Sequence, residues 1–421
     1  MTTRKYATIL TAIALATFVS AKASPYRLAR VTVPDDTLCI KADMAHLIFP
    51  GNHSAFDLLY KKFAKLLARG NNRINILHMG GSHVQAGYLS DQLRNNLTNM
   101  HDSSGVFHAK AADRGAVFPF KAVRTNAPTS YTISHTGRWR VSKCLSSAPD
   151  ATLGLCGIAA LTNDSDASLT LSLPDDTYSF DKLRVLGYSE GASFPVIVMG
   201  ADTIFPAVSD HKSGYMFHLP AVTTQCKVSF CNVNDSNTFV VRGLMPESNR
   251  KGITYQESGV NGAAVPSWLN CAALEEEMKL VCPDMIIFGI GINDAATTYD
   301  NFNPDTFKTN YRTLIDKTKK VSPKAALLFI TNNDCYQSVR TKRPNQNTER
   351  VAQAFKELAQ EYNGAVFDLY QVMGGQNSSA VWAQQQLMQS DRVHFTESGY
   401  RIVGNLIYNA LVEDFENSLN H

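Results

Sequence analysis

Residues 74–83 read INILHMGGSH, a short apolar run that ends in two glycines and is followed by a serine and a histidine. The next segment, 84–100, carries apolar residues at helical spacing, so this part of the sequence predicts a strand, a tight turn and a helix. Similar apolar runs occur at 285–288, 325–330 and 365–367. Because these runs show no alternation, each is expected to be a strand buried on both faces, as in a parallel sheet.

Segments with helical spacing separate the apolar runs. They are expected at 266–281, 307–320, 350–362 and 398–415, and the last of them closes the chain. The alternation of such helices with buried strands predicts an α/β unit in which helices cover both faces of a parallel sheet.

The pattern changes between about residues 122 and 250. Residues 168–173 (SLTLSL) and 227–230 (KVSF) alternate polar and apolar side chains, and 182–186 does so more roughly. Clusters of Pro, Gly, Asp and Asn punctuate these runs, and no strong helical pattern occurs. This pattern predicts half-exposed strands at the spacing of a β sandwich. The chain is therefore expected to hold an all-β unit inserted into an α/β unit.

We place the boundaries of the units at these changes of pattern. Residues 24–121 are expected to form the first part of the α/β unit, 122–250 the insert and 251–421 the second part. The abrupt change at both borders also predicts that the insert folds on its own and is not needed for the chemical step.

Residues 1–23 have the pattern of a secretory signal peptide. Arg4 and Lys5 precede an apolar run whose end carries the small-x-small sequence AKA. A membrane anchor is the alternative, but the run is short for a bilayer span and no basic flank follows it. We therefore expect export with cleavage, and no stable membrane span afterwards. Cleavage would lower the formal net charge from +3 to zero, which leaves no electrostatic basis for binding nucleic acid.

The chain contains eight cysteines and no CxxC motif, so zinc binding and thioredoxin-like chemistry have little support. An even number of cysteines in an exported chain favours disulfides, whose connectivity the sequence leaves open. A bond between Cys271 and Cys282 is disfavoured. If 266–281 is one helix, these residues lie roughly 16 Å apart along it, which is beyond the reach of a disulfide.

Four segments carry the residue types that acyl transfer requires. They are Gly80–His83 (GGSH), 258–264 (SGVNGAA), 289–294 (GIGIND) and 391–394 (DRVH), and each ends a strand or opens a helix. Taken alone, each has a plainer explanation as a helix N-cap, a loop or a turn. Catalytic groups of open parallel sheets gather at the carboxyl ends of the strands, where we expect the four segments to meet.

The residue types fit a serine nucleophile beside an oxyanion hole. Ser82 is placed at a helix N-terminus, where backbone N–H groups can hold an oxyanion, and the Asn293 side chain can donate to the same charge. Asp391 and His394 lie three residues apart on a turn. The carboxylate can therefore fix the imidazole tautomer while the other ring nitrogen accepts the serine proton.

The order of these residues resembles the sequence blocks of the SGNH (GDSL-like) hydrolases, over roughly 73–120 and 251–415. The correspondence is Gly80-x-Ser82 with block I, Gly259-x-x-Gly262 with block II, Gly291-x-Asn293-Asp294 with block III and Asp391-x-x-His394 with block V. The resemblance implies a flavodoxin-like parallel sheet with helices on both faces, interrupted by the sandwich-like insert.

The resemblance also implies the roles of the site residues. Ser82 would be the nucleophile, His394 the base and Asp391 its orienter. The oxyanion hole would consist of the Ser82 N–H, the Gly262 N–H and the Asn293 side chain. We expect no cofactor and no metal, because no carboxylate or third histidine joins the two histidines at 78 and 83.

Block I departs from the usual family pattern at one position. The family usually carries Asp before the serine, whereas this chain has Gly81, for which we expect altered local packing rather than lost activity. His83, followed by VQA, is similar to the block I of exported bacterial enzymes related to peptidoglycan O-acetylesterases. Some of those enzymes carry a carbohydrate-binding-like β domain after block I. His83 is expected either to contact substrate or to support the site from behind.

Residues 187–191 (GYSEG) fit the G-x-S-x-G pattern of a nucleophile elbow. That motif requires a helix directly after the serine. Residues 192–198 (ASFPVIV) instead read as a strand and contain proline. We therefore expect a hairpin of the insert here, and Ser189 is not expected to be a nucleophile.

The sequence thus predicts a serine esterase that hydrolyses an O-acetyl ester on a glycan such as peptidoglycan, through an acyl-Ser82 intermediate. The runs 114–119 (RGAVFP) and 382–394 resemble two-domain members of the family from Bacteroides-type bacteria. We expect the protein in the periplasm or cell envelope of a Gram-negative bacterium, with secretion as the alternative. A lipase- or thioesterase-like acylhydrolase is the alternative enzyme. A catalytically weakened glycan-binding envelope protein is the alternative from another class, with Gly81 as its support. Four aromatic residues of the insert are expected either to stack on sugar faces or to be buried: Tyr131, Trp139, Tyr178 and Tyr188.

Overall fold

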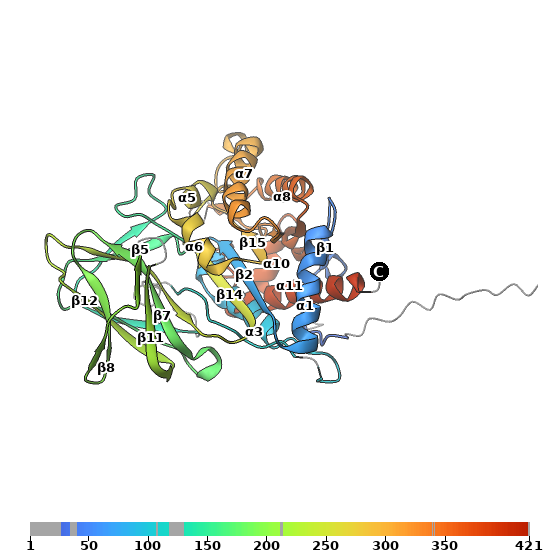
Figure 1. Ribbon diagram of the computed structural model, residues 1–421. Helices are drawn as coiled ribbons and strands as arrows, with labels where there is room; N and C mark the ends of the chain where they lie inside the picture. The colour runs from blue at the N-terminus through green and yellow to red at the C-terminus, as the bar shows by residue number, and fades with distance from the viewer. Residues whose placement is uncertain are drawn as a thin grey trace, which may run out of the picture.

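The computed structural model describes residues 27–33, 40–106, 108–117, 130–210, 214–338, 340 and 342–419. The predicted signal peptide at 1–23, Cys39 and the predicted border at 121/122 lie outside these residues. Within them the chain forms two units that lie side by side, an α/β unit and a β unit (Figure 1).

The α/β unit is built on one six-stranded sheet. Its strands are β1 (Leu47–Ile48), β2 (Arg73–Gly80), β14 (Gly252–Gly259), β15 (Met285–Gly289), β16 (Ala326–Ile330) and β19 (Ala365–Phe367). They follow the order β1-β19-β16-β15-β2-β14, and all are parallel except β1, which is antiparallel to β19. Numbered along the chain, the parallel strands have the order 2-1-3-4-5 of flavodoxin-like folds. The predicted fold class is confirmed.

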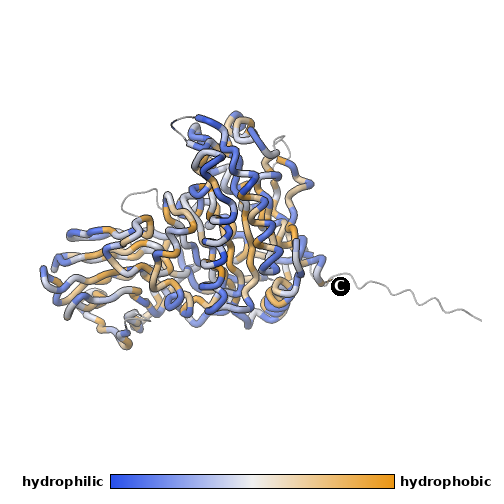
Figure 2. The backbone as a smooth tube through the Cα atoms, turned by 90° about the horizontal axis from the view of Figure 1, so that it is seen from above, coloured by the Kyte–Doolittle hydropathy of each residue, from blue (hydrophilic) through white to orange (hydrophobic). Residues whose placement is uncertain are grey.

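Helices cover both faces of this sheet, because successive side chains of a strand point to opposite faces and here both sets are apolar. On β2, Ile74 and Ile76 belong to one core, whereas Leu77 and Met79 belong to the other. The first core is covered by α1 (Ser54–Arg69), α3 (Tyr88–Thr98) and α11 (Glu397–Ser418), and the second by α6 (Leu274–Val281), α7 (Pro304–Val321) and α8 (Thr348–Tyr362). Figure 2 shows the hydrophobic stretches gathered along the central strands.

Two predicted helices are broken in the structure. The segment 84–100 consists of α2 (Ser82–Gln85) and α3, separated at Gly87, whose φ of 88° is in the left-handed region that glycine adopts without a steric penalty. The segment 266–281 consists of α5 (Val265–Leu269) and α6. An apolar pattern does not reveal such breaks, because the pieces on either side of each break still bury apolar residues.

The β unit is a sandwich of two antiparallel sheets, as predicted for the insert. The strands are β3 (Thr132–Thr136), β4 (Arg140–Lys143), β5 (Ile158–Thr162), β6 (Ser168–Ser172), β7 (Phe180–Ser189), β8 (Phe194–Met199), β9 (Asp202–Ile204), β10 (Val208–Asp210), β11 (Gly214–Thr223), β12 (Gln225–Cys231) and β13 (Phe239–Glu247). One sheet has the order β10-β11-β7-β13-β5-β4 and the other β3-β6-β12-β8-β9. Phe230 and Phe239 join the sheets, with ring centroids 5.0 Å apart.

The two units share one continuous hydrophobic core, which extends from Leu77 of the α/β sheet to Leu169 of the sandwich. At the junction the fully buried Glu277 of α6 forms a 2.6 Å ion pair with Arg242 of β13 and accepts the N–H of Leu155 at 2.6 Å. This continuity argues against the independent folding that the change of sequence pattern led us to expect.

Ser189, the serine of the G-x-S-x-G pattern, is the last residue of β7. The next strand, β8, belongs to the other sheet, so residues 187–191 connect two sheets rather than form the expected hairpin. Ser189 Oγ lies 2.7 Å from Ser193 Oγ, and no helix follows it. The geometry of a nucleophile elbow is therefore absent at this serine.

The seven cysteines that the structure describes are all free thiols, so the favoured disulfides are not formed among them. In the same part of the chain, no helix combines the length and the apolar character that crossing a bilayer requires.

Candidate active site

The segment with Ser82 leaves the sheet where three strand ends meet. Gly80, the last residue of β2, is in register with Gly259 of β14 and Gly289 of β15. A Cβ on Gly80 would overlap the side chain of Val84, so only glycine permits this tight turn. Ser82 is consequently the first residue of α2, at the carboxyl edge of the sheet where α/β proteins place their ligands.

Ser82, His394 and Asp391 form one line of hydrogen bonds. His394 Nε2 lies 2.8 Å from Ser82 Oγ, although the two residues are 312 positions apart in the chain. His394 Nδ1 lies 2.7 Å from Asp391 Oδ2. The structure therefore brings together the three predicted triad residues in the geometry that general-base activation of a hydroxyl requires.

The turn from Asp391 to His394 owes its shape to a strained residue. Arg392 has a backbone φ of 50°, which is uncommon for residues other than glycine. Its guanidinium lies 4.3 Å from the centroid of the Tyr336 ring and donates to Ser379 Oγ at 2.8 Å. These contacts hold the backbone in the conformation that turns Asp391 and His394 toward each other.

Asp391 is held as an anion. Burial raises its pKa, but the hydrogen bond from the His394 ring and those from the backbone N–H groups of His394 and Val393 outweigh burial and lower the pKa to about 2. A carboxylate that stays ionised near neutral pH can stabilise the imidazolium that forms when His394 takes a proton.

The predicted oxyanion donors lie on the same edge of the sheet. The Asn293 Nδ2 group donates to the carbonyl oxygen of Ala263 at 2.9 Å. A Cβ on Gly81 would lie only 3.3 Å from Asn293 Nδ2, so the amide packs against the backbone next to Ser82. Gly262 is exposed and has a φ of 81°, which turns its peptide in a way that other residues rarely adopt. The structure thus brings Asn293 and the carbonyl group of Ala263, which follows Gly262, beside Gly81, the residue before Ser82.

Asp294 connects the third block to the second. Both of its carboxylate oxygens accept the N–H of Val265, at 3.1 and 3.2 Å, where α5 begins. Burial raises the pKa of Asp294 to about 6, even though the Val265 N–H favours the charged form. Asp294 therefore fixes the loop that carries Gly262. Among the described residues, it forms no hydrogen bond with Ser82 or His394.

The His83 ring lies beside the triad. Its Nδ1 lies 2.8 Å from the Tyr400 hydroxyl, and its ring centroid lies 5.4 Å from that of His394. Burial, with a smaller contribution from the charge of His394, lowers the pKa of His83 to about 3, so its ring is neutral at neutral pH. Since its Nε2 is also buried, this arrangement favours a supporting role over the contact with substrate that was the other expectation.

His78 does not join His83 in a metal site. Its side chain is fully buried, and its Nδ1 lies 2.8 Å from the Tyr255 hydroxyl. Burial lowers the pKa of His78 to about 3. In the part of the chain that the structure describes, no cluster of three or more His, Cys, Asp or Glu side chains is arranged to hold a metal ion.

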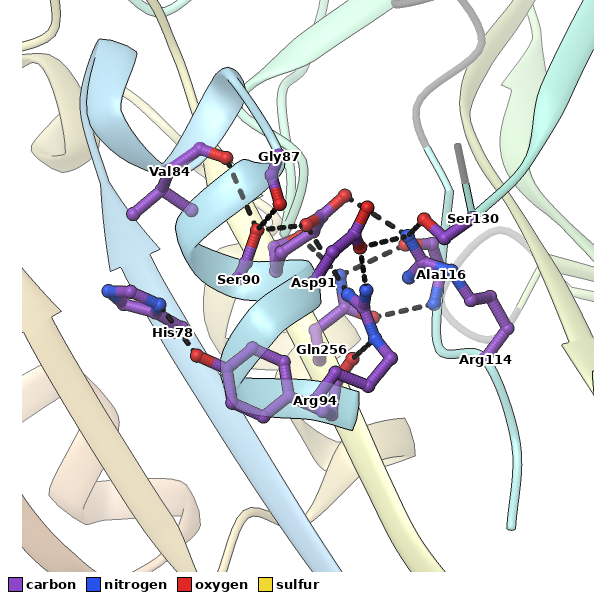
Figure 3. Close-up of polar contacts among 12 residues, drawn as sticks. His78, Val84, Gly87, Ser90, Asp91, Arg94, Arg114, Ala116, Ser130 and Gln256 are labelled. Carbon is purple, nitrogen blue, oxygen red and sulfur yellow. Dashed lines mark hydrogen bonds and ion pairs between the residues drawn. The ribbon is translucent and has the colours of Figure 1, made fainter. Parts of the chain in front are cut away.

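A buried charged cluster ties α3 to β14 (Figure 3). Glu257 of β14 accepts hydrogen bonds from Ser90, from Arg94 at 3.3 Å and from Arg114 at 3.2 Å. Arg94 also pairs with Asp91 one turn earlier in α3. Each buried charge has a partner of opposite sign. The cluster therefore fixes α3 against β14.

Sequence reasoning missed this cluster and the roles of Asp294 and Tyr400. One signal was present, since Glu257 interrupts the otherwise uncharged strand ITYQESG directly before the second block. A charge inside a buried strand requires a partner. The partners come from distant segments, and no local pattern identifies them.

The aromatic side chains of the β unit are largely held inside the protein. Tyr131 and Tyr178 are buried, and the Tyr188 hydroxyl accepts the N–H of Thr152 at 3.0 Å. Trp139 is half-buried and packs edge-on against Phe230, 5.5 Å between centroids. Burial, rather than stacking on a sugar, therefore accounts for Tyr131 and Tyr178.

Comparison with protein families agrees with this geometry. The family model of GDSL-like lipases and acylhydrolases matches residues 226–402. The matched range includes Gly262, Asn293 and the turn from Asp391 to His394. It begins within β12 of the β unit and omits Ser82. No curated protein matches the chain.

Solved structures extend the similarity to the β unit. A structure described as a peptidoglycan O-acetylesterase in action has a TM-score of 0.69 and 20% identity, and the match covers 88% of this chain and 99% of that one. At this identity the match shows a shared fold. A lipase/acylhydrolase from Enterococcus faecalis covers 40% of this chain and 77% of its own, at 23% identity and a TM-score of 0.31. An acetylxylan esterase from Geobacillus stearothermophilus covers 38% and 73%, at 20% identity and a TM-score of 0.30.

Proposed function

We propose that this chain is a carboxylic ester hydrolase of the SGNH (GDSL-like) type and that it removes O-acetyl groups from an envelope glycan such as peptidoglycan. The observation that carries the proposal is the line of hydrogen bonds from Asp391 through His394 to Ser82. Such a line activates a serine hydroxyl toward an ester carbonyl.

In the acylation step Ser82 Oγ bonds to the carbonyl carbon of the ester while His394 Nε2 takes the hydroxyl proton. The carbonyl oxygen becomes an oxyanion, which the N–H groups of Ser82 and Gly262 and the Asn293 amide stabilise. When this intermediate collapses, the bond to the sugar oxygen breaks, and His394 returns its proton to that oxygen. The products are acetyl-Ser82 and a free sugar hydroxyl.

In the deacylation step a water molecule takes the place of the serine hydroxyl. His394 removes one proton from the water, whose oxygen bonds to the acetyl carbon, and the same donors hold the second oxyanion. Cleavage of the bond to Ser82 Oγ releases acetate, and His394 returns the proton to Ser82. Asp391 balances the charge of the imidazolium in both steps.

A fold match supports the proposed substrate class, and the N-terminal sequence supports the proposed cellular location of the protein. The fold match includes the β unit of a peptidoglycan O-acetylesterase, which favours an O-acetylated glycan over a lipid. The signal-like sequence at 1–23 favours export to the periplasm or cell envelope, where such a glycan lies. We further propose that His83 positions His394 rather than binding substrate.

Acetate release tests the proposal directly. Purified protein should release acetate from O-acetylated peptidoglycan and none from the same material after mild base has removed its acetyl groups. Ser82→Ala should abolish release, whereas Ser189→Ala should not change it. A fluorophosphonate probe should label Ser82 by mass spectrometry, also in the Ser189→Ala variant.

Two outcomes would contradict different parts of the proposal. If Ser82→Ala retained full activity, the site would be wrong. If the protein hydrolysed p-nitrophenyl acetate but released no acetate from the glycan, ester hydrolysis would stand and the proposed substrate would be wrong.

A further inference from the structure

One large apolar side chain of the β unit lies at the rim of the proposed oxyanion hole. Leu145 follows β4, and 46% of its surface is exposed. A Cβ placed on Gly262 would lie 3.7 and 3.9 Å from the two methyl carbons of Leu145. These methyl groups therefore lie just beyond the space that a side chain at Gly262 would occupy, and the Gly262 N–H is one of the three proposed oxyanion donors.

Hydrogen bonds to the α/β unit fix the position of Leu145. The Asn270 side chain, between α5 and α6, donates to the carbonyl oxygens of Cys144 and Ser146, both at 2.9 Å. These are the residues on either side of Leu145. The Cys144 N–H donates to the carbonyl oxygen of Gly157 at 2.9 Å. Leu145 is thus held on a loop that the α/β unit clamps at both sides.

The thiols beside this loop add a further contact between the units. Cys144 and Cys271 are both fully buried. The hydrogen bond between their side chains, together with burial, raises the pKa of the Cys271 thiol well above its usual value. The Cys271 thiol therefore stays protonated and packs as a small apolar side chain beside the loop.

We propose that Leu145 is a specificity-determining residue, whose methyl groups form an apolar wall against the acyl group of the bound ester. The inference rests on the proposed function and assigns the β unit a direct part in the active site. An acyl carbon that bonds to Ser82 must lie beside the oxyanion donors, so the substituent on that carbon passes close to Gly262 and hence to Leu145.

The chemistry of the substrate selects the acyl group over the alcohol as the partner of this wall. A sugar presents hydroxyl groups, which lose hydrogen bonds to water when they face a leucine. The acetyl methyl is apolar, and contact with leucine methyl groups removes both from water. A fixed leucine also limits the space beyond the methyl, so longer acyl chains should fit less well.

Substitution of Leu145 tests this inference through the preference for acyl length. We expect Leu145→Ala to raise the ratio of kcat/KM for p-nitrophenyl butyrate over p-nitrophenyl acetate by about tenfold, the lower end of the discrimination that one methylene group provides. Leu58→Ala on α1 is the matched control. Leu58 has the same side chain and the same exposed fraction of 46%, and its substitution should leave the ratio unchanged.

A second variant tests the clamp without altering Leu145. In Asn270→Asp the carboxylate keeps the shape of the amide but cannot donate to the two carbonyl oxygens. The loop should loosen, and the butyrate-to-acetate ratio should rise as in Leu145→Ala. A ratio within twofold of wild type in Leu145→Ala would overturn this inference while leaving the proposed ester hydrolysis intact. A wild-type protein without activity on either ester would overturn both.

Discussion

The side-chain amide of Asn293 donates a hydrogen bond to the carbonyl oxygen of Ala263, 2.9 Å away. Ala263 directly follows Gly262, so this bond holds two of the three proposed oxyanion donors at a fixed spacing. An amide nitrogen carries two hydrogens, and the second has no partner among the described residues. Asn293 can therefore serve an oxyanion while it positions the neighbouring loop.

Replacement of Asn293 should lower the rate of the chemical step. We expect Asn293→Ala to reduce kcat by about 10²–10³, with KM little changed, because the lost donor acts on the oxyanion of the transition state. Asn293→Asp keeps the shape but presents a negative charge, so its loss should be larger. Steady-state kinetics with p-nitrophenyl acetate would measure both. A loss below about threefold in Asn293→Ala would remove Asn293 from the oxyanion hole.

The two glycines before Ser82 should respond differently to alanine. A Cβ on Gly80 would overlap Val84, so Gly80→Ala should destabilise the fold by about 1–3 kcal/mol, as overpacking does. Gly81 has a φ of −98°, and a Cβ there would meet Asn293 Nδ2 at 3.3 Å, a contact that a small shift relieves. Gly81→Ala should therefore leave the melting temperature within a few degrees of wild type. Equal losses of melting temperature in the two variants would contradict this account of the turn.

The sequence was sufficient for the features that local patterns determine. Continuous apolar runs predicted β2, β15, β16 and β19, because a strand buried on both faces has few alternatives. Period-two alternation predicted the sandwich. The motif order predicted that Ser82, Asn293 and His394 lie at one edge of the sheet, because the carboxyl ends of parallel strands meet there.

What the sequence missed depends on contacts between distant segments. The break after Leu269 arises where Asn270 bonds to Cys144 and Ser146 of the β unit, and no helical pattern records such a partner. Leu145 belongs to a loop without a motif, and its neighbour Gly262 follows more than a hundred residues later. The sequence pattern likewise did not predict the continuous core. A change of pattern marks a change of secondary structure and not a border between independently folding units.

The hydrogen bonds from Asp391 through His394 to Ser82 predict how much activity is lost when each of the three residues is replaced. His394→Ala should lose about as much activity as Ser82→Ala, and the double variant should lose little more, because these groups act as a unit. Asp391→Asn should lower kcat by up to about 10⁴, because the amide favours the wrong imidazole tautomer. Activities of the three variants on p-nitrophenyl acetate would establish the ranking. Additive losses in the double variant would contradict a shared role.

The pKa of Asp391 constrains the pH profile of the enzyme. Because hydrogen bonds lower this pKa to about 2 in spite of burial, the carboxylate remains ionised throughout the range from pH 4 to 8. Asp391 should therefore produce no step in kcat/KM over this range, and any ionisation seen there belongs to another group. An acidic step in this range that disappears in Asp391→Asn would contradict this account.

The ion pair at the junction should contribute more to stability than a pair on the surface. Arg242→Ala leaves the fully buried Glu277 without its 2.6 Å partner, which should cost about 3–5 kcal/mol. Arg312→Ala is the matched control. Its partner Glu361 is 42% exposed, so this change should cost about 0–1 kcal/mol. Urea unfolding would measure both. Since the core is continuous, wild type should unfold in one transition, and two separate transitions would contradict a shared core.

Asp294 should make the stability of the α/β unit depend on pH. Burial raises its pKa to about 6 in the folded state, whereas an unfolded aspartate has a pKa of about 3.9. Between these values the folded chain retains a proton that the unfolded chain has released. The contribution of Asp294 to stability is therefore greatest below about pH 4 and declines as the pH rises to about 6.

The isosteric change Asp294→Asn should reveal this dependence, because asparagine does not titrate and still offers one oxygen to the Val265 N–H. The melting temperature of the variant relative to wild type should increase from pH 4 to pH 7 and level off above that. Asp300→Asn, at an exposed position, controls for the loss of one negative charge. Scanning fluorimetry at one-unit pH intervals would measure the difference for each variant. If the difference between Asp294→Asn and wild type stayed constant from pH 4 to 7, Asp294 would not be the buried group that releases its proton near pH 6.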